Sequence, residues 1–242
     1  MSKSDKYYDF LIERRQAILD RAAAAAHKSG RSLPEIDIVC VSKTVDTDSV
    51  VAAHDIGWKH FAENRPQELD KKLSELEAMG IKDEFVFDMI GNLQTNKINQ
   101  VLASSPRLIH SVDALKLAEN ISKRALRDEV VAPVLLQVNT SGEESKSGFS
   151  PKEIKACFED LLDLEGLDVL GLMTMAPKDN KSAARKCFRD TRKLQDQLID
   201  EYEWELPIMS AGMSGDFEIA IEEGSNLVRL GRVVFDNEYN LI

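Results

Sequence analysis

The chain has 242 residues, 43% of them hydrophobic and 30% charged, so it can bury one large core, and α/β barrels of about 250 residues are commonly one domain. Its net charge of −11 works against binding to DNA, RNA or anionic lipid. No apolar run approaches the roughly 20 residues of a membrane span, and the N-terminus lacks the apolar stretch of a secretory signal. We therefore expect a cytoplasmic protein with reduced cysteines, which are Cys40, Cys157 and Cys187.

A long helix is predicted over about residues 6–27, because Leu11, Ile18 and Ala22 share one apolar stripe and Gly30 can end it. After it, short apolar runs alternate with helical patterns, which is typical of repeated βα units around a parallel sheet. The predicted strands span residues 36–42, 58–63, 85–90, 108–111, 131–139, 169–175, 206–210 and 227–233.

These elements predict a single (β/α)₈ barrel with an extra N-terminal helix, in which residues 1–242 form one domain. The runs IDIVCV, VLLQV and LGLMTM are almost continuously apolar, as strands buried on both faces should be. A doubly wound open sheet is the main alternative, because alternation alone does not show closure. In a barrel the loops after the strands form the binding face, and we interpret residues 140–148 as one such loop rather than a linker.

Lys43 follows the apolar run IDIVCVS directly, which places an amine where the first predicted strand ends. A lysine at the mouth of an apolar barrel is partly desolvated, and desolvation favours the neutral amine that forms an imine with an aldehyde. The structural alternative is a lysine whose ammonium group simply reaches solvent.

The segment SAGMSGD, residues 210–216, has the composition of a phosphate-binding turn. Ser214 can cap a helix predicted from about residue 215 to 222, and the free N–H groups and dipole at a helix start attract phosphate. Ordinary capping without a ligand gives the same pattern.

The segment VRLGR, residues 228–232, places the charged Arg229 inside an apolar strand and Gly231 two residues later. Gly231 allows a ligand to approach backbone N–H groups closely, as in phosphate sites after the last two strands of barrels. A salt bridge to a nearby carboxylate is the alternative explanation for Arg229. Together with Lys43, these features indicate an aldehyde that carries a phosphate.

These motifs resemble the family of pyridoxal phosphate (PLP) homeostasis proteins, also called YggS-like or proline synthetase co-transcribed proteins, which are related to the N-terminal barrel of alanine racemase. The similarity extends over nearly the whole chain. It rests on VSKT around Lys43, FAENRPQE at residues 61–68, IGNLQTNK at 90–97, HSVD at 110–113, NTSGEESKSGF at 139–149, GLMTM at 171–175, GMSGD at 212–216 and VRLG at 228–231.

The resemblance implies that PLP is the cofactor and that Lys43 holds it as an internal aldimine. It also implies that the phosphate is held by Ser214, Gly231 and the backbone of Arg232. Where this chain has Arg232, relatives often have a hydroxyl residue. Arg232 therefore cannot supply a hydroxyl contact to the phosphate, although a guanidinium can also bind phosphate directly.

The resemblance further implies that Arg229 faces the pyridine nitrogen, which keeps that nitrogen unprotonated and weakens the electron sink used by most PLP enzymes. Asn64, at the end of the second predicted strand, is expected beside the cofactor, with capping of the next helix as its structural alternative. Asp88 departs from the family pattern, because relatives usually carry histidine there. Further departures are Ala62, Arg65, Pro66 and Ala211.

In the resembling racemases a second catalytic base, a tyrosine, comes from an additional β-domain that this sequence lacks, and Tyr239 is a poor candidate for a positioned base. We therefore predict PLP binding in PLP homeostasis without robust turnover, and we assign no catalytic residue. Three alternatives remain: a single-base PLP-dependent amino-acid racemase or decarboxylase with Lys43 as base, a Schiff-base aldolase acting on a sugar phosphate, and a protein-interaction module.

The expected partners are PLP, amino acids and PLP-dependent apoenzymes, and a closed barrel of this kind is expected to be a monomer. No metal site is predicted, since the histidines lack the spacing of metal ligands; they are His27, His54, His60 and His110.

Overall fold

The computed structural model describes residues 5–143 and 146–241. Their eight strands form a closed barrel in sequence order, and β8 pairs with β1. The strands are β1 (Asp37–Val41), β2 (His60–Glu63), β3 (Val86–Met89), β4 (Ile109–Val112), β5 (Ala132–Gln137), β6 (Leu167–Met173), β7 (Ile208–Ser210) and β8 (Leu227–Leu230). Every pairing is parallel. The predicted (β/α)₈ barrel is confirmed over the open-sheet alternative.

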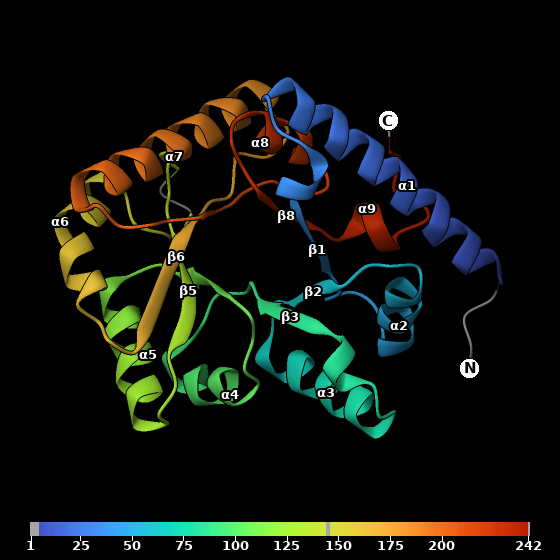
Figure 1. The fold of residues 1–242 in the computed structure, drawn as a ribbon, viewed down its shortest axis with the longest axis horizontal. Helices are drawn as coiled ribbons and strands as arrows, with labels where there is room; N and C mark the ends of the chain where they lie inside the picture. The colour runs from blue at the N-terminus through green and yellow to red at the C-terminus, as the bar shows by residue number, and fades with distance from the viewer. Residues whose placement is uncertain (1–4, 144–145, 242) are drawn as a thin grey trace.

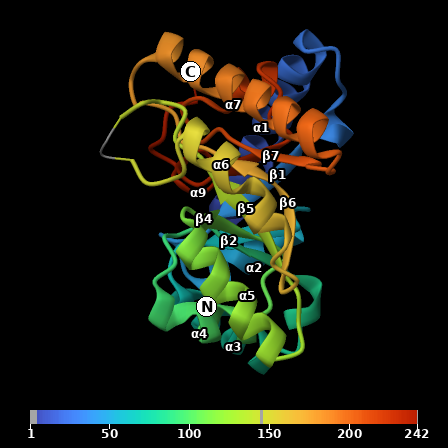
Figure 2. The ribbon, with the colours of Figure 1, turned by 90° about the vertical axis from the view of Figure 1, so that its left-hand side faces the viewer.

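Helices surround the barrel (Figure 1). They are α1 (Asp5–Lys28), α2 (Thr47–Asp55), α3 (Pro66–Ala78), α4 (Ile98–Ala103), α5 (Leu115–Arg127), α6 (Pro151–Leu162), α7 (Lys181–Tyr202), α8 (Phe217–Glu222) and α9 (Arg232–Phe235). In Figure 2, α5, α6 and α7 cover the outside of β5 and β6. None of the helices described is long and apolar enough to cross a membrane.

The strands alternate their side chains between two cores, as pleated strands require. Outward-facing residues such as Cys40 and Val228 pack against the helices. Inward-facing residues such as Val39, Val41 and Leu135 form a separate apolar cluster inside the barrel. Polar side chains share this interior and are also buried: Asp88, His110, Ser210 and Arg229.

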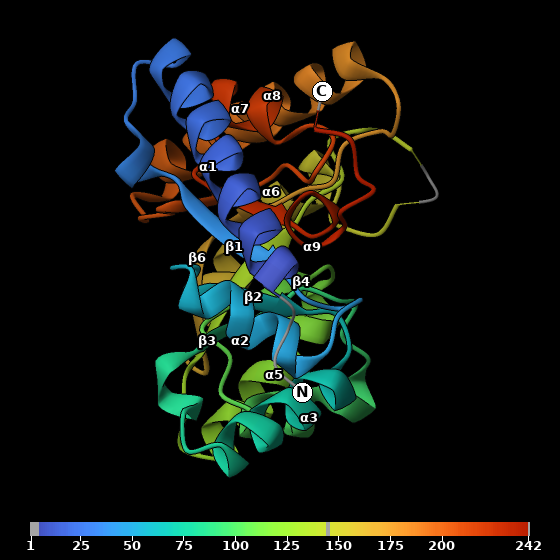
Figure 3. The same ribbon diagram turned by 90° about the vertical axis from the view of Figure 1, so that its right-hand side faces the viewer.

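The predicted N-terminal helix is confirmed as α1, which buries its apolar stripe and ends before Gly30, a residue with a φ of +73°. It lies across α8 and α9, as Figure 3 shows. Arg21 pairs with Glu218 of α8 at 2.5 Å. Arg14 donates a hydrogen bond to the backbone carbonyl of Tyr239 at 2.9 Å, which joins α1 to the segment after α9.

The eighth strand is shorter than predicted, because it ends at Leu230 instead of residue 233. Gly231 leaves the extended conformation with φ −106° and ψ −84°, and α9 begins directly after it. The helix predicted from residue 215 begins at Phe217. The predicted loop over residues 140–148 includes residues 144 and 145, which lie outside the described ranges.

Replacing Ile18 by alanine should lower the free energy of unfolding by about 2–5 kcal/mol, because its side chain is fully buried between α1 and the barrel. The same replacement at Ile12, 53% exposed on the same helix, should change it by no more than about 0.5 kcal/mol. Urea unfolding measures both. Equal losses in the two variants would contradict the packing described for α1.

Candidate functional site

The predicted site residues lie on or after four strands that are neighbours in the closed barrel, β7, β8, β1 and β2. Val41 at the end of β1 is in register with Ala62 of β2, and Cys40 is in register with Leu230 of β8. Since parallel strands end at the same edge, the turns after them meet at one end of the barrel.

The predicted phosphate-binding segments meet here. The hydroxyl of Ser214 accepts a hydrogen bond from the backbone N–H of Val233 at 3.2 Å, so Ser214 lies against the first turn of α9. The expectation that Ser214 caps α8 is therefore wrong: Asp216 is at the N-cap position of α8. The difference arises because α9, which is distant in sequence, offers unpaired N–H groups beside this loop.

Gly231 is not required by the fold, which makes it informative about a ligand. Its φ of −106° lies outside the left-handed region that favours glycine. A Cβ placed on it would lie 3.4 Å from the carbonyl oxygen of Val41, an ordinary contact. By contrast, Gly212 has a φ of +96°, and a Cβ there would lie only 2.7 Å from the Cβ of Ala220. A side chain at Gly231 would thus make only ordinary contacts with Val41, and the glycine leaves the backbone at the start of α9 bare, which suits close approach of a phosphate.

The side chain of Arg232 is exposed and lies over the ring of Tyr239, with 5.1 Å from the guanidinium carbon to the ring centroid. The Tyr239 hydroxyl donates to the backbone carbonyl of Ser214 at 2.9 Å. The loop after β7 and the segment after α9 are therefore joined around the predicted phosphate position.

Lys43 lies in the turn two residues after β1, and its side chain is exposed. The expected partial desolvation of its amine is therefore wrong for this structure. The reason is that β1 ends at Val41, so Lys43 lies in the turn after the strand and not among its inward-facing residues.

A buried ion pair lies next to this turn and was missed by the sequence analysis. Glu63 and Lys72 are both buried, with 2.7 Å between Oε1 and Nζ. Ser42 donates to the same Glu63 oxygen at 2.6 Å, whereas Oε2 of Glu63 has no hydrogen-bond partner. A signal was present, because Lys72 falls on the buried stripe of α3 between Leu69 and Leu76.

Asn64 is half-buried in the turn after β2. It does not cap α3, because Arg65 occupies the N-cap position. Its backbone packs tightly on Gly91 after β3, where a Cβ would lie 1.9 Å from the carbonyl oxygen of Asn64. The AEN and IGN motifs are therefore in direct contact.

Arg229 is 5% exposed on β8. Its Nη1 donates to the hydroxyl of Ser210 at 2.5 Å, and its Nη2 donates to the carbonyl of Thr174 at 3.1 Å. Both of these hydrogen-bond partners are uncharged. Among the described residues, they take the place of the carboxylate that the salt-bridge explanation of Arg229 required. Burial lowers the pKa of Arg229 to about 10, although the nearby Asp216 carboxylate opposes this shift. The guanidinium is thus a buried cation that stays protonated at neutral pH.

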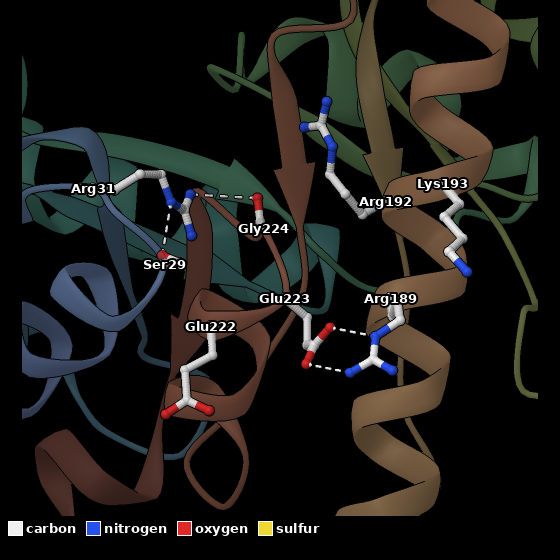
Figure 4. Close-up of a pocket in the computed structure, with 8 residues that line it drawn as sticks. All are labelled: Ser29, Arg31, Arg189, Arg192, Lys193, Glu222, Glu223 and Gly224. Carbon is white, nitrogen blue, oxygen red and sulfur yellow. Dashed lines mark hydrogen bonds and ion pairs between the residues drawn. The ribbon is translucent and has the colours of Figure 1, made fainter.

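A pocket of about 440 Å³ lies elsewhere, between α7 and the segments that follow α1 and α8 (Figure 4). It is lined by Ser29, Arg31, Arg189, Arg192, Lys193, Glu222, Glu223 and Gly224. Most of its charged side chains have partners: Arg189 pairs with Glu223 at 2.8 Å, Glu222 pairs with Lys28 at 2.8 Å, and Arg31 donates to the carbonyl of Ser225 at 3.0 Å. None of the predicted cofactor-binding residues lines it, so it is a separate feature at the other end of the barrel.

Comparison with known proteins identifies the family. The alanine racemase N-terminal domain family matches residues 16–237. The pyridoxal phosphate homeostasis protein of Aquifex aeolicus is 41% identical over 224 residues, covering 92% of this chain and 96% of that protein. This chain belongs to the pyridoxal phosphate homeostasis protein family. The human member is 34% identical over 233 residues, covering 91% of this chain and 84% of its own.

Solved structures of relatives share this fold. PipY of Synechococcus elongatus, determined with PLP bound, matches with a TM-score of 0.80 and 26% identity, covering 93% of this chain and 99% of PipY. Alanine racemase of Clostridium difficile matches with a TM-score of 0.68 and 17% identity, covering 92% of this chain and 60% of the racemase. The racemase likeness concerns the fold alone.

Replacing Lys72 by methionine should lower the free energy of unfolding by about 3–5 kcal/mol, because it leaves the buried Glu63 carboxylate unpaired. Lys71→Met is the matched control, since Lys71 is 65% exposed in a loose pair with Glu75, and it should change stability by no more than about 1 kcal/mol. Urea denaturation of both variants tests this. A Lys72 variant as stable as the control would show that the pair does not hold α3 to the barrel.

Proposed function

We propose that this protein binds PLP at the carboxyl end of its barrel strands, with the PLP aldehyde linked covalently to the Lys43 amine. The observation that carries this proposal is that an exposed amine after β1, the Ser214 loop against the start of α9, and a buried guanidinium on β8 all belong to neighbouring strands of the barrel. The PLP-bound structure of PipY, a relative with the same fold, supports it.

In this proposal the phosphate lies beside the start of α9. The Ser214 hydroxyl and the backbone N–H groups of Gly231 and Arg232 bind its oxygens, as hydroxyls and free N–H groups at a helix start do. The guanidinium of Arg232 adds positive charge there. Gly231 supports this placement, because it leaves the backbone at the start of α9 without a side chain although a Cβ there would make only ordinary contacts with Val41.

Arg229 is proposed to face the pyridine nitrogen and Asn64 to lie beside the ring. When bound, PLP supplies an electrophilic aldehyde and a pyridine ring that can take up electrons. A guanidinium that stays protonated donates a hydrogen bond to the ring nitrogen and does not protonate it, so the ring is a weaker electron sink. This arrangement suits holding the cofactor better than driving chemistry on it.

We further propose a role in storing, buffering or delivering PLP, without robust turnover. The names of the relatives as homeostasis proteins support this role, and the exposure of Lys43 suits exchange of the cofactor. The Tyr239 hydroxyl is engaged with the Ser214 carbonyl at 2.9 Å, which does not favour it as a second base. Rapid stereoinversion of single amino-acid enantiomers by the PLP-loaded protein would instead favour the single-base racemase.

The remaining parts of the proposal rest on the sequence and the family resemblance. They are a cytoplasmic monomer, a single domain over residues 1–242, and transfer of PLP to PLP-dependent apoenzymes, with amino acids as further ligands. The net charge of −11 is consistent with the absence of nucleic acid from these partners.

Lys43→Ala should abolish the visible absorbance band of the PLP-loaded protein, because no amine remains to bind the aldehyde covalently. Borohydride reduction followed by peptide mapping should place the pyridoxyl group on Lys43 in the wild type. Lys71→Ala, on the exposed face of α3, should keep both signals. An adduct on Lys72 or another lysine, or no adduct, would overturn the assignment.

Gly231→Ala should weaken PLP binding about tenfold or more, because a methyl group would enter the space proposed for the phosphate. Its free energy of unfolding should change by no more than about 0.5 kcal/mol, since the added Cβ meets only an ordinary contact with Val41. Absorbance titration with PLP and urea unfolding measure the two effects. Unchanged PLP affinity in a stable variant would place the phosphate elsewhere.

A further inference from the structure

A line of buried polar side chains crosses the barrel interior beneath Arg229. The hydroxyl of Ser210 on β7 lies 2.5 Å from Arg229 Nη1 and 3.1 Å from Nδ1 of His110 on β4. Nε2 of His110 lies 3.0 Å from Oδ2 of Asp88 on β3. Asp88, His110 and Ser210 have no exposed surface, so water does not compete for these contacts.

Asp88 is held as a carboxylate from its other side. Arg107 donates to both of its oxygens, at 2.8 Å and 2.6 Å, and also pairs with Asp37. Burial raises the pKa of Asp88, but the hydrogen bonds and charges of Arg107 and His110 outweigh this and leave it below its usual value. A bidentate arginine pair of this kind is among the stronger hydrogen-bonded contacts in proteins.

An ionised Asp88 determines the direction of every hydrogen bond above it. A carboxylate only accepts, so His110 must carry its proton on Nε2. Burial lowers the pKa of His110, with Asp88 opposing the shift, so the ring is neutral and its Nδ1 accepts. The Ser210 hydroxyl must then donate to Nδ1, and its oxygen accepts from Arg229. One consistent order of donors and acceptors results.

We propose that Asp88 and His110 are positioning residues that hold the guanidinium of Arg229 in place for the PLP ring. Asp88 fixes the tautomer of His110, His110 orients the Ser210 hydroxyl, and Ser210 with the Thr174 carbonyl fixes two nitrogens of the guanidinium. This inference rests on the proposed PLP site. It gives a specific role to Asp88, one of the positions at which this chain departs from the family pattern.

The first experiment needs no PLP, so it is independent of the proposed function. Long-range nitrogen–proton NMR of the histidine rings in the full chain should show His110 neutral with its proton on Nε2 at pH 7. Asp88→Asn should remove this fixed tautomer. Ser210→Ala should retain it, because Asp88 is unchanged. A proton on Nδ1, or a charged ring, in the wild type would overturn the proposal.

The second experiment measures PLP affinity and the position of the visible band in the PLP-loaded protein. Asp88→Asn and Ser210→Ala should each weaken PLP binding about tenfold and shift the band, because Arg229 loses its orientation. Asp70→Asn is the control: this half-buried carboxylate bonds Gln100 and Ser104 outside the barrel. It should leave both signals unchanged.

The outcomes separate the two proposals. Wild-type affinity and spectrum in the Ser210 variant would overturn the positioning role even while Lys43→Ala abolishes the visible band. If Lys43→Ala leaves the band intact, the PLP site itself is wrong, whatever the tautomer of His110. Should Asp88→Asn fail to fold, Ser210→Ala decides the question, because it removes only one hydroxyl group.

Discussion

The pairing of β8 with β1 is the constraint on which the site depends. It sets Arg229 in register with Val39 and brings Gly231 against Val41, two residues before Lys43. Without this closure Lys43 and the proposed phosphate site, which lie near opposite ends of the sequence, would have no reason to meet. Closure also buries Arg229, which must then satisfy its donors with the interior groups Ser210 and Thr174.

Much of the fold was predictable, because strands covered on both faces are nearly continuous apolar runs in the sequence. The errors came where the partner of a residue is distant along the chain. Ser214 was assigned to the helix that follows it, but the free N–H groups that it meets belong to α9. The last strand was predicted too long, because apolar character continues past Gly231 while the backbone does not stay extended.

The site was predictable in position more than in environment. Motifs placed the candidate residues on or after neighbouring strands of the barrel, yet Lys43 is exposed where partial desolvation was expected. Neither the Glu63–Lys72 pair nor the contacts of Asp88 with Arg107 and His110 follow from local patterns, since each joins different elements. Such pairs form inside the fold because a buried charge without a partner is costly.

The closure of the barrel also has a consequence for biosynthesis. Lys43 is synthesised 188 residues before Gly231. Until the last strand has been made, β1 has no β8 to pair with. A nascent chain therefore carries the reactive amine long before it carries the groups that would retain a phosphate. If Lys43 and the turn before α9 hold the vitamin as proposed, its capture is a property of the finished polypeptide, and a chain that stops before α9 has the lysine without the proposed phosphate site.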